Sequence, residues 1–232
     1  MATHALNDIL APFLKEKKKL LPEFEAKEVL RTWGLSVPPC LVAQNLNQAV
    51  QCADKLGYPV ALKVNSPAIV HKSDVGGVKL NLVDGQAVAQ AYREIERACA
   101  PLDPKFKVLV QPMAHPGVEV ILGVSEDAQF GKAIMFGLGG VFVELFQDTS
   151  FRLIPVSRSQ AMEMISSIKG FPLLKGYRGR APADTELLAD MVVSLSNLVT
   201  QHPVISELDL NPIIVYPKGA AIVDARIVLK TT

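Results

Sequence analysis

The sequence has few cysteines, almost no net charge and no long hydrophobic run. Its three cysteines, Cys40, Cys52 and Cys99, are scattered and show no CxxC spacing, which predicts reduced thiols in a cytoplasmic protein. This pattern excludes a zinc site and a disulfide framework. The 24 basic residues almost balance the 23 acidic ones, which argues against a nucleic-acid-binding protein. No apolar run approaches the ~20 residues that span a membrane, and the N-terminus lacks the order of a secretory signal.

Hydrophobic residues make up 49% of the 232-residue chain, which is enough for a substantial core. Helical and strand-like patterns alternate without internal repeats, which predicts a mixed α/β protein. The expected helices are 1–20, 23–33, 45–56, 84–100, 159–168 and 184–201. The expected strands are 59–64, 78–82, 107–112, 118–125, 131–138, 151–156, 206–215 and 221–228. We expect an N-terminal helical segment (1–22), a first lobe (23–110) and a second lobe (111–232).

The stretch from Ala61 to Leu80 carries the strongest functional signal. Lys63 and Lys79 lie on two expected strands and can present fixed positive charge to phosphates. Between these strands, the pair Gly76-Gly77 permits a turn whose backbone N–H groups approach an anion. His71 lies in the same connection and can act as a base, a ligand or a phosphoryl acceptor. The stretch therefore predicts a nucleotide-phosphate site, although a structural role for His71 stays open from these residues alone.

A second signal is the segment Glu207-Leu208-Asp209-Leu210-Asn211-Pro212, followed by Asp224 across an expected hairpin. Asp209 and Asn211 share one face of a strand because side chains alternate. A turn at residues 217–220 would place Asp224 opposite Ile213 and diagonal to Asn211. Three oxygen donors on one rigid face suit Mg2+, with Glu207 nearby as a further group. The alternative is a solvated polar face of an edge hairpin.

A third, weaker signal is the loop Gly137-Leu138-Gly139-Gly140, in which glycines follow an apolar strand. Arg152 lies on the next expected strand and can hold either a phosphate or an acid such as Glu144.

These segments together resemble the ATP-grasp fold, and more closely the nucleotide-binding beta subunit of the NDP-forming acyl-CoA synthetases. The resemblance covers about residues 23–228. Its most specific parts are Gly57-Tyr58-Pro59-Val60-Ala61-Leu62-Lys63, the run from Ser66-Pro67 through His71-Lys72-Ser73-Asp74-Val75-Gly76-Gly77-Val78, the glycine loop at 137–140, Glu207 to Pro212, and Asp224-Ala225-Arg226.

The resemblance implies two lobes that clasp a nucleotide and a reversible reaction, acyl-CoA + ADP + phosphate to acid + CoA + ATP. It implies ATP/ADP and Mg2+ as cofactors, and a CoA-binding alpha subunit in an α2β2 assembly. By the family's motif, His71 would receive the phosphoryl group, Glu207 would orient a histidine, and Asp209, Asn211 and Asp224 would hold Mg2+. The resemblance places the nucleotide phosphates against Lys63 and Lys79, and the adenine and ribose against Gln111, Pro112, Met113 and Glu119. Gly76, Gly77 and Arg152 join these predicted nucleotide-binding residues on the chemical arguments given above. Acyl recognition would lie on the partner, so the acid stays unnamed.

Two alternatives stay open at this point. The chain can be a non-catalytic ATP-sensing module, or it can belong to another ligase class, such as the beta subunit of succinate–CoA ligase. The segment Val70-His71-Lys72-Ser73-Asp74 favours the acetate-type branch by similarity.

Overall fold

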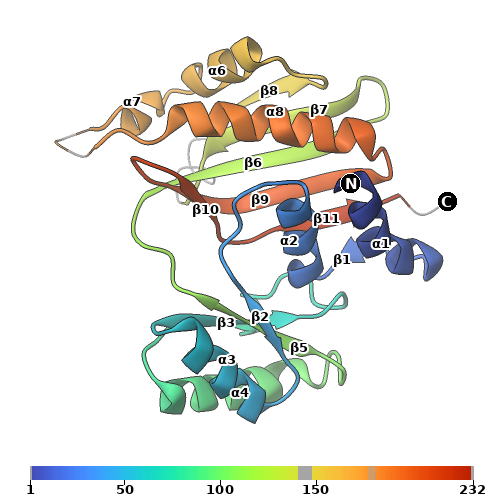
Figure 1. Ribbon diagram of the computed structural model, residues 1–232, viewed down its shortest axis with the longest axis vertical. Helices are drawn as coiled ribbons and strands as arrows, with labels where there is room; N and C mark the ends of the chain where they lie inside the picture. The colour runs from blue at the N-terminus through green and yellow to red at the C-terminus, as the bar shows by residue number, and fades with distance from the viewer. Residues whose placement is uncertain (1, 141–147, 178, 180, 231–232) are drawn as a thin grey trace. The chain divides into compact units, whose positions relative to one another are not determined.

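The computed structural model describes residues 2–140, 148–177, 179 and 181–230 (Figure 1). The chain divides into two compact units. The smaller unit contains residues 22–25 and 38–114, and the larger unit contains residues 1–21, 26–37 and 115–232. Among the described residues, no helix combines the length and the apolar character that crossing a membrane requires.

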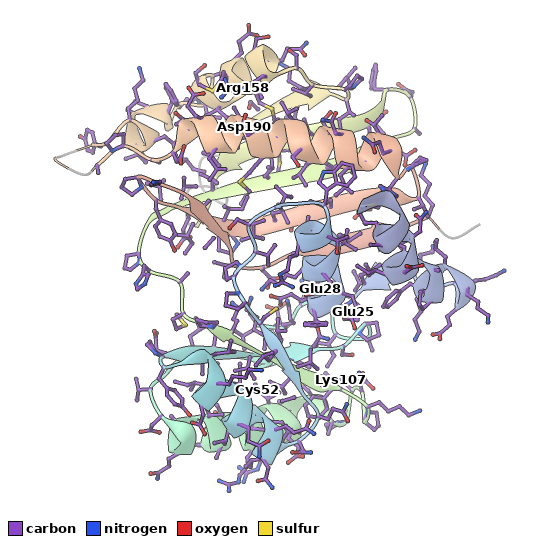
Figure 2. All side chains as sticks on the ribbon, in the orientation of Figure 1. Glu25, Glu28, Cys52, Lys107, Arg158 and Asp190 are labelled. Carbon is purple, nitrogen blue, oxygen red and sulfur yellow. The ribbon has the colours of Figure 1, made fainter. Side chains whose placement is uncertain are left out.

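The smaller unit is a four-stranded antiparallel sheet with two helices packed on one face. Its strand order is β2 (Leu41–Ala43), β5 (Lys107–Pro112), β3 (Val60–Asn65) and β4 (Val78–Leu82). Figure 2 marks this unit by Cys52, on α3, and Lys107, at the start of β5. Helices α3 (Leu46–Leu56) and α4 (Gly85–Cys99) begin after Asn45 and Asp84, whose side chains accept backbone N–H groups of the first turn.

The two faces of β3 have different partners. Val60, Leu62 and Val64 belong to the core shared with α3 and α4. Because side chains alternate along a strand, Ala61, Lys63 and Asn65 leave from the opposite face. The first turn of α2 (Glu23–Thr32) lies against that face, since the Phe24 N–H donates to Asn65 Oδ1 at 3.1 Å.

The larger unit is an antiparallel sheet covered on one face by helices. Its strand order is β1 (Leu20–Leu21), β11 (Arg226–Leu229), β9 (Ile205–Val215), β6 (Val118–Asp127), β7 (Gly131–Leu138) and β8 (Thr149–Leu153), with β10 (Ala220–Ile222) also paired to β9. Helices α6 (Arg158–Ser166) and α8 (Thr185–Gln201) lie side by side over the sheet, next to the short α7 (Phe171–Leu174). Leu6 and Leu10 of α1 (Ala2–Lys15) join the same core, with Val29 and Leu30 of α2.

A bulge in β9 changes which face its side chains take. Val120 pairs with Ile213 and Leu122 pairs with Leu210, so β9 has one more residue than β6 over this stretch. Leu208 and Leu210 point into the core before the bulge, and Ile213 and Val215 do so after it. Asp209 and Asn211 therefore leave from the face opposite the core.

Most of the expected helices and strands are present. The differences lie mainly where pairing between strands that are distant in the sequence sets the bounds of an element. The observed β4, β5 and β7 have the bounds expected from the sequence. The first helix ends at Lys15, and Leu20–Leu21 instead pairs with β11. The expected strand 221–228 is divided into β10 and β11, and α7 was not expected. The smaller unit ends at Ala114 rather than at the expected residue 110, and residues 26–37 belong to the larger unit.

Candidate active site

The first turn of α2 brings a carboxylate to the lysine of β3. Lys63 is 3% exposed, and its Nζ donates to Glu23 Oε1 at 2.9 Å. The other carboxylate oxygen, Glu23 Oε2, accepts a hydrogen bond from Lys72 Nζ. Buried charges need such partners because their desolvation is costly. The sequence did not single out Glu23, since an acidic residue in a first helical turn is common for reasons of helix electrostatics alone.

The loop that carries His71 is fixed on both sides of the histidine. Before it, Ile69 is buried in the core of the smaller unit, and Ser66 Oγ donates to Asp103 Oδ2 at 2.6 Å. After it, the Lys72 side chain is held by Glu23, while the Lys72 carbonyl accepts the Gly77 N–H at 2.8 Å. His71 itself is exposed. An exposed imidazole between two anchored neighbours is suited to react with a group that approaches from outside the loop.

Gly76 and Gly77 close this loop against β3. Gly76 has a φ of +71°, which favours glycine, and its N–H donates to Ser73 O at 3.1 Å. A Cβ added to Gly77 would lie 2.6 Å from Val64 Cγ1. Both amides thus bond within the loop, and these hydrogen bonds lend no support to the predicted contact between the two amides and a phosphate.

The structure does not bring Lys63 and Lys79 together. Lys63 pairs across the strands with Val78, whereas Lys79 pairs with Leu62, which faces the helices. The Lys79 Nζ accordingly forms an ion pair with Glu94 Oε2 of α4 at 2.5 Å. The two ammonium groups therefore leave from opposite faces of the sheet. Lys63 lies on the same face as Glu23, the residue that anchors the His71 loop through Lys72.

The segment Gln111 to Met113, the predicted base-reading segment, continues the Lys63 face. Gln111 is buried and pairs with Ala61, which shares its face with Lys63. Pro112 pairs with Val60, and the Met113 N–H donates to Pro59 O at 2.9 Å. Lys63, Gln111 and Glu23, the residue that anchors the His71 loop, thus all belong to the smaller unit.

In the larger unit, Asp209 and Asp224 lie close to each other, although the expected hairpin register is wrong. Ile222, not Asp224, pairs with Ile213, because the turn closes at Gly219, whose φ is +87°. The Val223 N–H donates to Pro212 O at 3.0 Å, and Arg226 pairs with Asp209. Asp224 lies between these two pairs, at the level of Asn211. The buried Lys27 holds the segment, since its Nζ donates to Val223 O at 2.9 Å.

The electrostatics around Asp209 fit a cation. Burial raises the pKa of Asp209, the Arg226 guanidinium lowers it, and the Asp224 carboxylate raises it again. A partly desolvated carboxylate facing a second carboxylate is stabilised in its ionised form by a bound cation. Within the described residues no cluster of three or more His, Cys, Asp and Glu gathers. The donors at this place are two carboxylates and the Asn211 amide, an all-oxygen set that fits Mg2+.

Glu119 lies directly under the glycine loop. The Gly139 N–H donates to Glu119 O at 2.7 Å, and a Cβ on Gly139 would lie 3.0 Å from Glu119 Cβ. A Cβ on Gly140, whose φ is +64°, would lie 3.0 Å from Glu119 Oε2. The two glycines therefore allow the loop to pass close to this carboxylate. Glu144, the acid that the sequence offered as an alternative partner of Arg152, lies outside the described residues.

Glu207 and Arg152 lie on opposite faces of the large sheet. Glu207 is exposed on the Asp209 face, with its Oε2 4.0 Å from Arg226 Nη2. Arg152 pairs with Ile134, which faces the helices, and its Nη1 donates to Phe151 O at 2.9 Å. The structure groups Glu207 with Asp209 and places Arg152 elsewhere.

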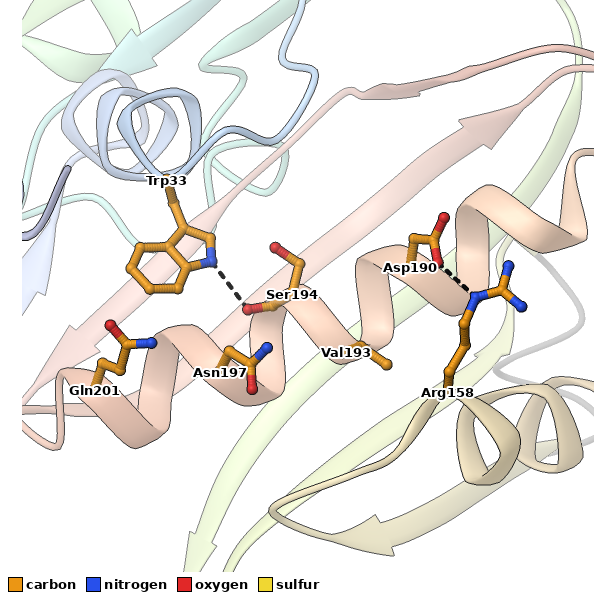
Figure 3. A pocket seen from close by; sticks show the side chains of 7 residues that line it. All are labelled: Trp33, Arg158, Asp190, Val193, Ser194, Asn197 and Gln201. Carbon is orange, nitrogen blue, oxygen red and sulfur yellow. Dashed lines mark hydrogen bonds and ion pairs between the residues drawn. The ribbon is translucent and has the colours of Figure 1, made fainter.

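A shallow groove runs along the outer side of α8 (Figure 3). Trp33 lies at one end, where its Nε1 donates to Ser194 O at 3.0 Å, and Arg158 lies at the other, bonded to Asp190. Val193, Ser194, Asn197 and Gln201 of α8 also line the groove, and none of the predicted site residues does.

The two sheets, the lysine on a central strand of the smaller one and the paired acids on the larger one define the ATP-grasp class. A family model described as an ATP-grasp domain matches residues 12–229. The chain is 46% identical over 228 residues to the subunit beta of acetate–CoA ligase [ADP-forming] II of Pyrococcus furiosus, which covers 96% of this chain and 97% of that one.

Solved structures agree with this assignment. The acetyl-coenzyme A synthetase 1 of Ca. Korarchaeum cryptofilum, in complex with coenzyme A, Ca-AMPCP and HgCl+, matches with a TM-score of 0.92 and 44% identity over 97% of this chain and 99% of that chain. A complex of the same enzyme with coenzyme A and Mg-AMPPCP, whose phosphohistidine segment points towards the nucleotide binding site, matches with a TM-score of 0.85 and 44% identity over 97% and 100% of the chains. The chain belongs to the ATP-grasp family and, within it, to the beta subunits of the ADP-forming acetate–CoA ligases.

Proposed function

We propose that this subunit passes a phosphoryl group between His71 and ADP or ATP, within the reaction acyl-CoA + ADP + phosphate to acid + CoA + ATP. The observation that carries this proposal is the position of His71, exposed on a loop whose two sides are anchored in the unit that also holds Lys63. Phosphoryl transfer depends mainly on position and charge neutralisation, and this arrangement supplies a positioned acceptor and a fixed cation.

In the direction of ATP consumption, the unprotonated nitrogen of a neutral His71 imidazole forms a bond to the γ-phosphorus. The bond between that phosphorus and the bridging oxygen breaks, and ADP leaves with the bonding electron pair. The proton on the other ring nitrogen stays in place. The step uses the neutral form of the imidazole, because only an unprotonated ring nitrogen has a lone pair with which to attack phosphorus.

Lys63 supplies positive charge to the nucleotide phosphates from a rigid strand, and Gln111 to Met113 line the base. Asp209, Asn211 and Asp224 hold Mg2+, which neutralises phosphate charge when it is bound. Glu207, on the same face as Asp209, orients a histidine during transfer. Glu119 completes the nucleotide contacts that we propose. Gly76 and Gly77 bond within the His71 loop, and Lys79 and Arg152 leave from the helix-covered faces of their sheets, so the structure lends their predicted contacts no support.

The partner is a CoA-binding alpha subunit, in an assembly that we propose to be α2β2. We propose a cytoplasmic location, for which the support is the scattered spacing of Cys40, Cys52 and Cys99 in the sequence.

The test is to incubate the full chain with Mg-ATP labelled in the γ-phosphate and to map the label after alkaline quenching. We expect a base-stable, acid-labile phosphohistidine at residue 71 and none in His71→Asn. With the alpha subunit added, His71→Asn should form no ATP from acetyl-CoA, ADP and phosphate. Full activity of His71→Asn would refute the proposal, and nucleotide binding without any phosphohistidine would indicate an ATP sensor instead.

A further inference from the structure

One carboxylate joins three elements of the smaller unit. Glu23 belongs to the first turn of α2, and it binds Lys63 of β3 and Lys72 of the His71 loop. Its side chain is 2% exposed, while those of Lys63 and Lys72 are 4% and 16% exposed. Such complete burial of a shared carboxylate gives both ion pairs a fixed geometry, unlike the mobile pairs of a surface.

The carboxylate itself has little freedom to move. Lys63 lies in the middle of β3, which is paired with β4 on one side and β5 on the other. The next residue, Phe24, donates its N–H to the buried Asn65 of the same strand. Glu23 is therefore fixed to the sheet through its side chain and through its neighbour's backbone.

This fixed point reaches His71 through the adjacent residue. The Lys72 side chain ends on Glu23 Oε2, and the Lys72 carbonyl accepts the Gly77 N–H. With its side chain and its carbonyl both held, Lys72 is fixed directly after His71. Ile69 is held in the core two residues before His71, so the histidine lies between two fixed positions of the chain.

We propose that Glu23 is a positioning residue for phosphoryl transfer at His71 and that it acts through Lys72. The inference rests on the proposed function, because it takes His71 as the phosphoryl acceptor. Misplacing a reacting group by about 1 Å can reduce a rate by about a hundredfold, so loss of this contact should slow transfer more than it weakens nucleotide binding.

The test measures the rate at which the full chain takes up label from Mg-[γ-32P]ATP, beside its affinity for Mg-AMPPCP. Lys72→Met removes the ammonium group and keeps the apolar stem. We expect it to label about tenfold more slowly or worse, with nucleotide affinity within about twofold of wild type. Lys72→Arg should recover most of the rate because a guanidinium can bind the same carboxylate.

The role of Glu23 is tested by a double variant. Glu23→Gln should slow labelling and also weaken nucleotide binding, because it releases Lys63 as well as Lys72. Adding Lys72→Met to Glu23→Gln should slow labelling no further, since both substitutions break the same contact. Glu126→Gln is the matched control: it removes an ion pair with Lys230 in the larger unit and should label at the wild-type rate.

The two proposals fail in different ways. Wild-type protein without phosphohistidine, or with label at a residue other than 71, overturns the proposed function. Label at residue 71 with wild-type rates in Lys72→Met and Glu23→Gln overturns only the positioning role of Glu23. If Lys72→Met is unstable in a melting assay, Lys72→Arg and Lys72→Gln carry the test, and equal labelling rates in these two overturn the role.

Discussion

Replacing Gly77 with alanine tests how tightly the His71 loop is closed against β3. The added Cβ would lie 2.6 Å from Val64 Cγ1, 3.3 Å from Val64 Cβ and 3.0 Å from the Lys72 carbonyl oxygen. Two of these atoms belong to a buried, β-branched side chain in a paired strand, and the third belongs to the backbone. None of them is the free end of a flexible side chain, so the overlap must be relieved by moving the strand or the loop.

Forced overpacking of this kind typically costs about 1–3 kcal/mol, and we expect about 2 kcal/mol for Gly77→Ala. For a chain of this length, that corresponds to a fall in melting temperature of about 4–8 °C. Thermal unfolding followed by circular dichroism measures the shift. A Gly77→Ala protein that melts within about 1 °C of wild type would refute the close contact.

Two further variants separate the overlap from other effects of alanine. Val64→Ala removes the Cγ1 atom nearest the new methyl group, so the double variant should lose less stability than the sum of the two single variants. Gly123→Ala is the matched control, because its Cβ would meet its nearest neighbours at 3.5 Å, an ordinary contact. Gly123→Ala should change the free energy of unfolding by less than about 0.5 kcal/mol.

Asp224→Asn should weaken binding of Mg-ATP by about tenfold or more relative to binding of metal-free ATP, because it removes one of the two carboxylates; calorimetry with and without Mg2+ checks this. Asp184→Ala should cost about 1–2 kcal/mol, since this side chain accepts the N–H groups of Gly219 and Leu187. These bonds lower the pKa of Asp184, so its contribution is present at neutral pH and is lost as the pH falls below about 3.9 and through the lowered value. Burial lowers the pKa of His202, so the unfolded chain binds its proton more readily and wild type should lose stability below about pH 6.5. His202→Phe should lose less stability than wild type between pH 7.5 and 5.5, as melting curves will measure.

The regular elements were predictable because their signals are local. The expected helices 45–56 and 84–100 start at Asn45 and Asp84, and in the structure these two side chains cap the first turns by accepting backbone N–H groups. The strand at 107–112 was predicted with its observed bounds because it contains the β-branched and apolar run Val108-Leu109-Val110 and ends at Pro112. The alternation of side chains along a strand also predicted that Asp209 and Asn211, two of the candidate metal ligands, leave from the same face of β9.

The contacts of the candidate site were less predictable because they depend on pairing between distant segments. Glu23 and Lys72 are 49 positions apart in the sequence, and no spacing rule connects them. The hairpin register was wrong by two residues because the turn closes at Gly219, so Ile213 pairs with Ile222 instead of Asp224. Asp224 nevertheless lies beside Asn211, since Val223 continues the pairing through its bond to Pro212.

The separation of Lys63 from Lys79 has one identifiable cause. If the pairing of Val60 with Leu82 continued regularly, Lys63 would lie directly opposite Lys79 on the same face. Instead, two residues of β4 oppose one residue of β3, so Leu62 pairs with Lys79, and Asn81 within this bulge has a φ of +57°. Asparagine tolerates this conformation better than most residues. The bulge removes a direct opposition of like charges, which would be destabilising, and leaves Lys63 alone to share Glu23 with Lys72. An extra residue in one strand thus decides which of two similar lysines lies on the face of the candidate site.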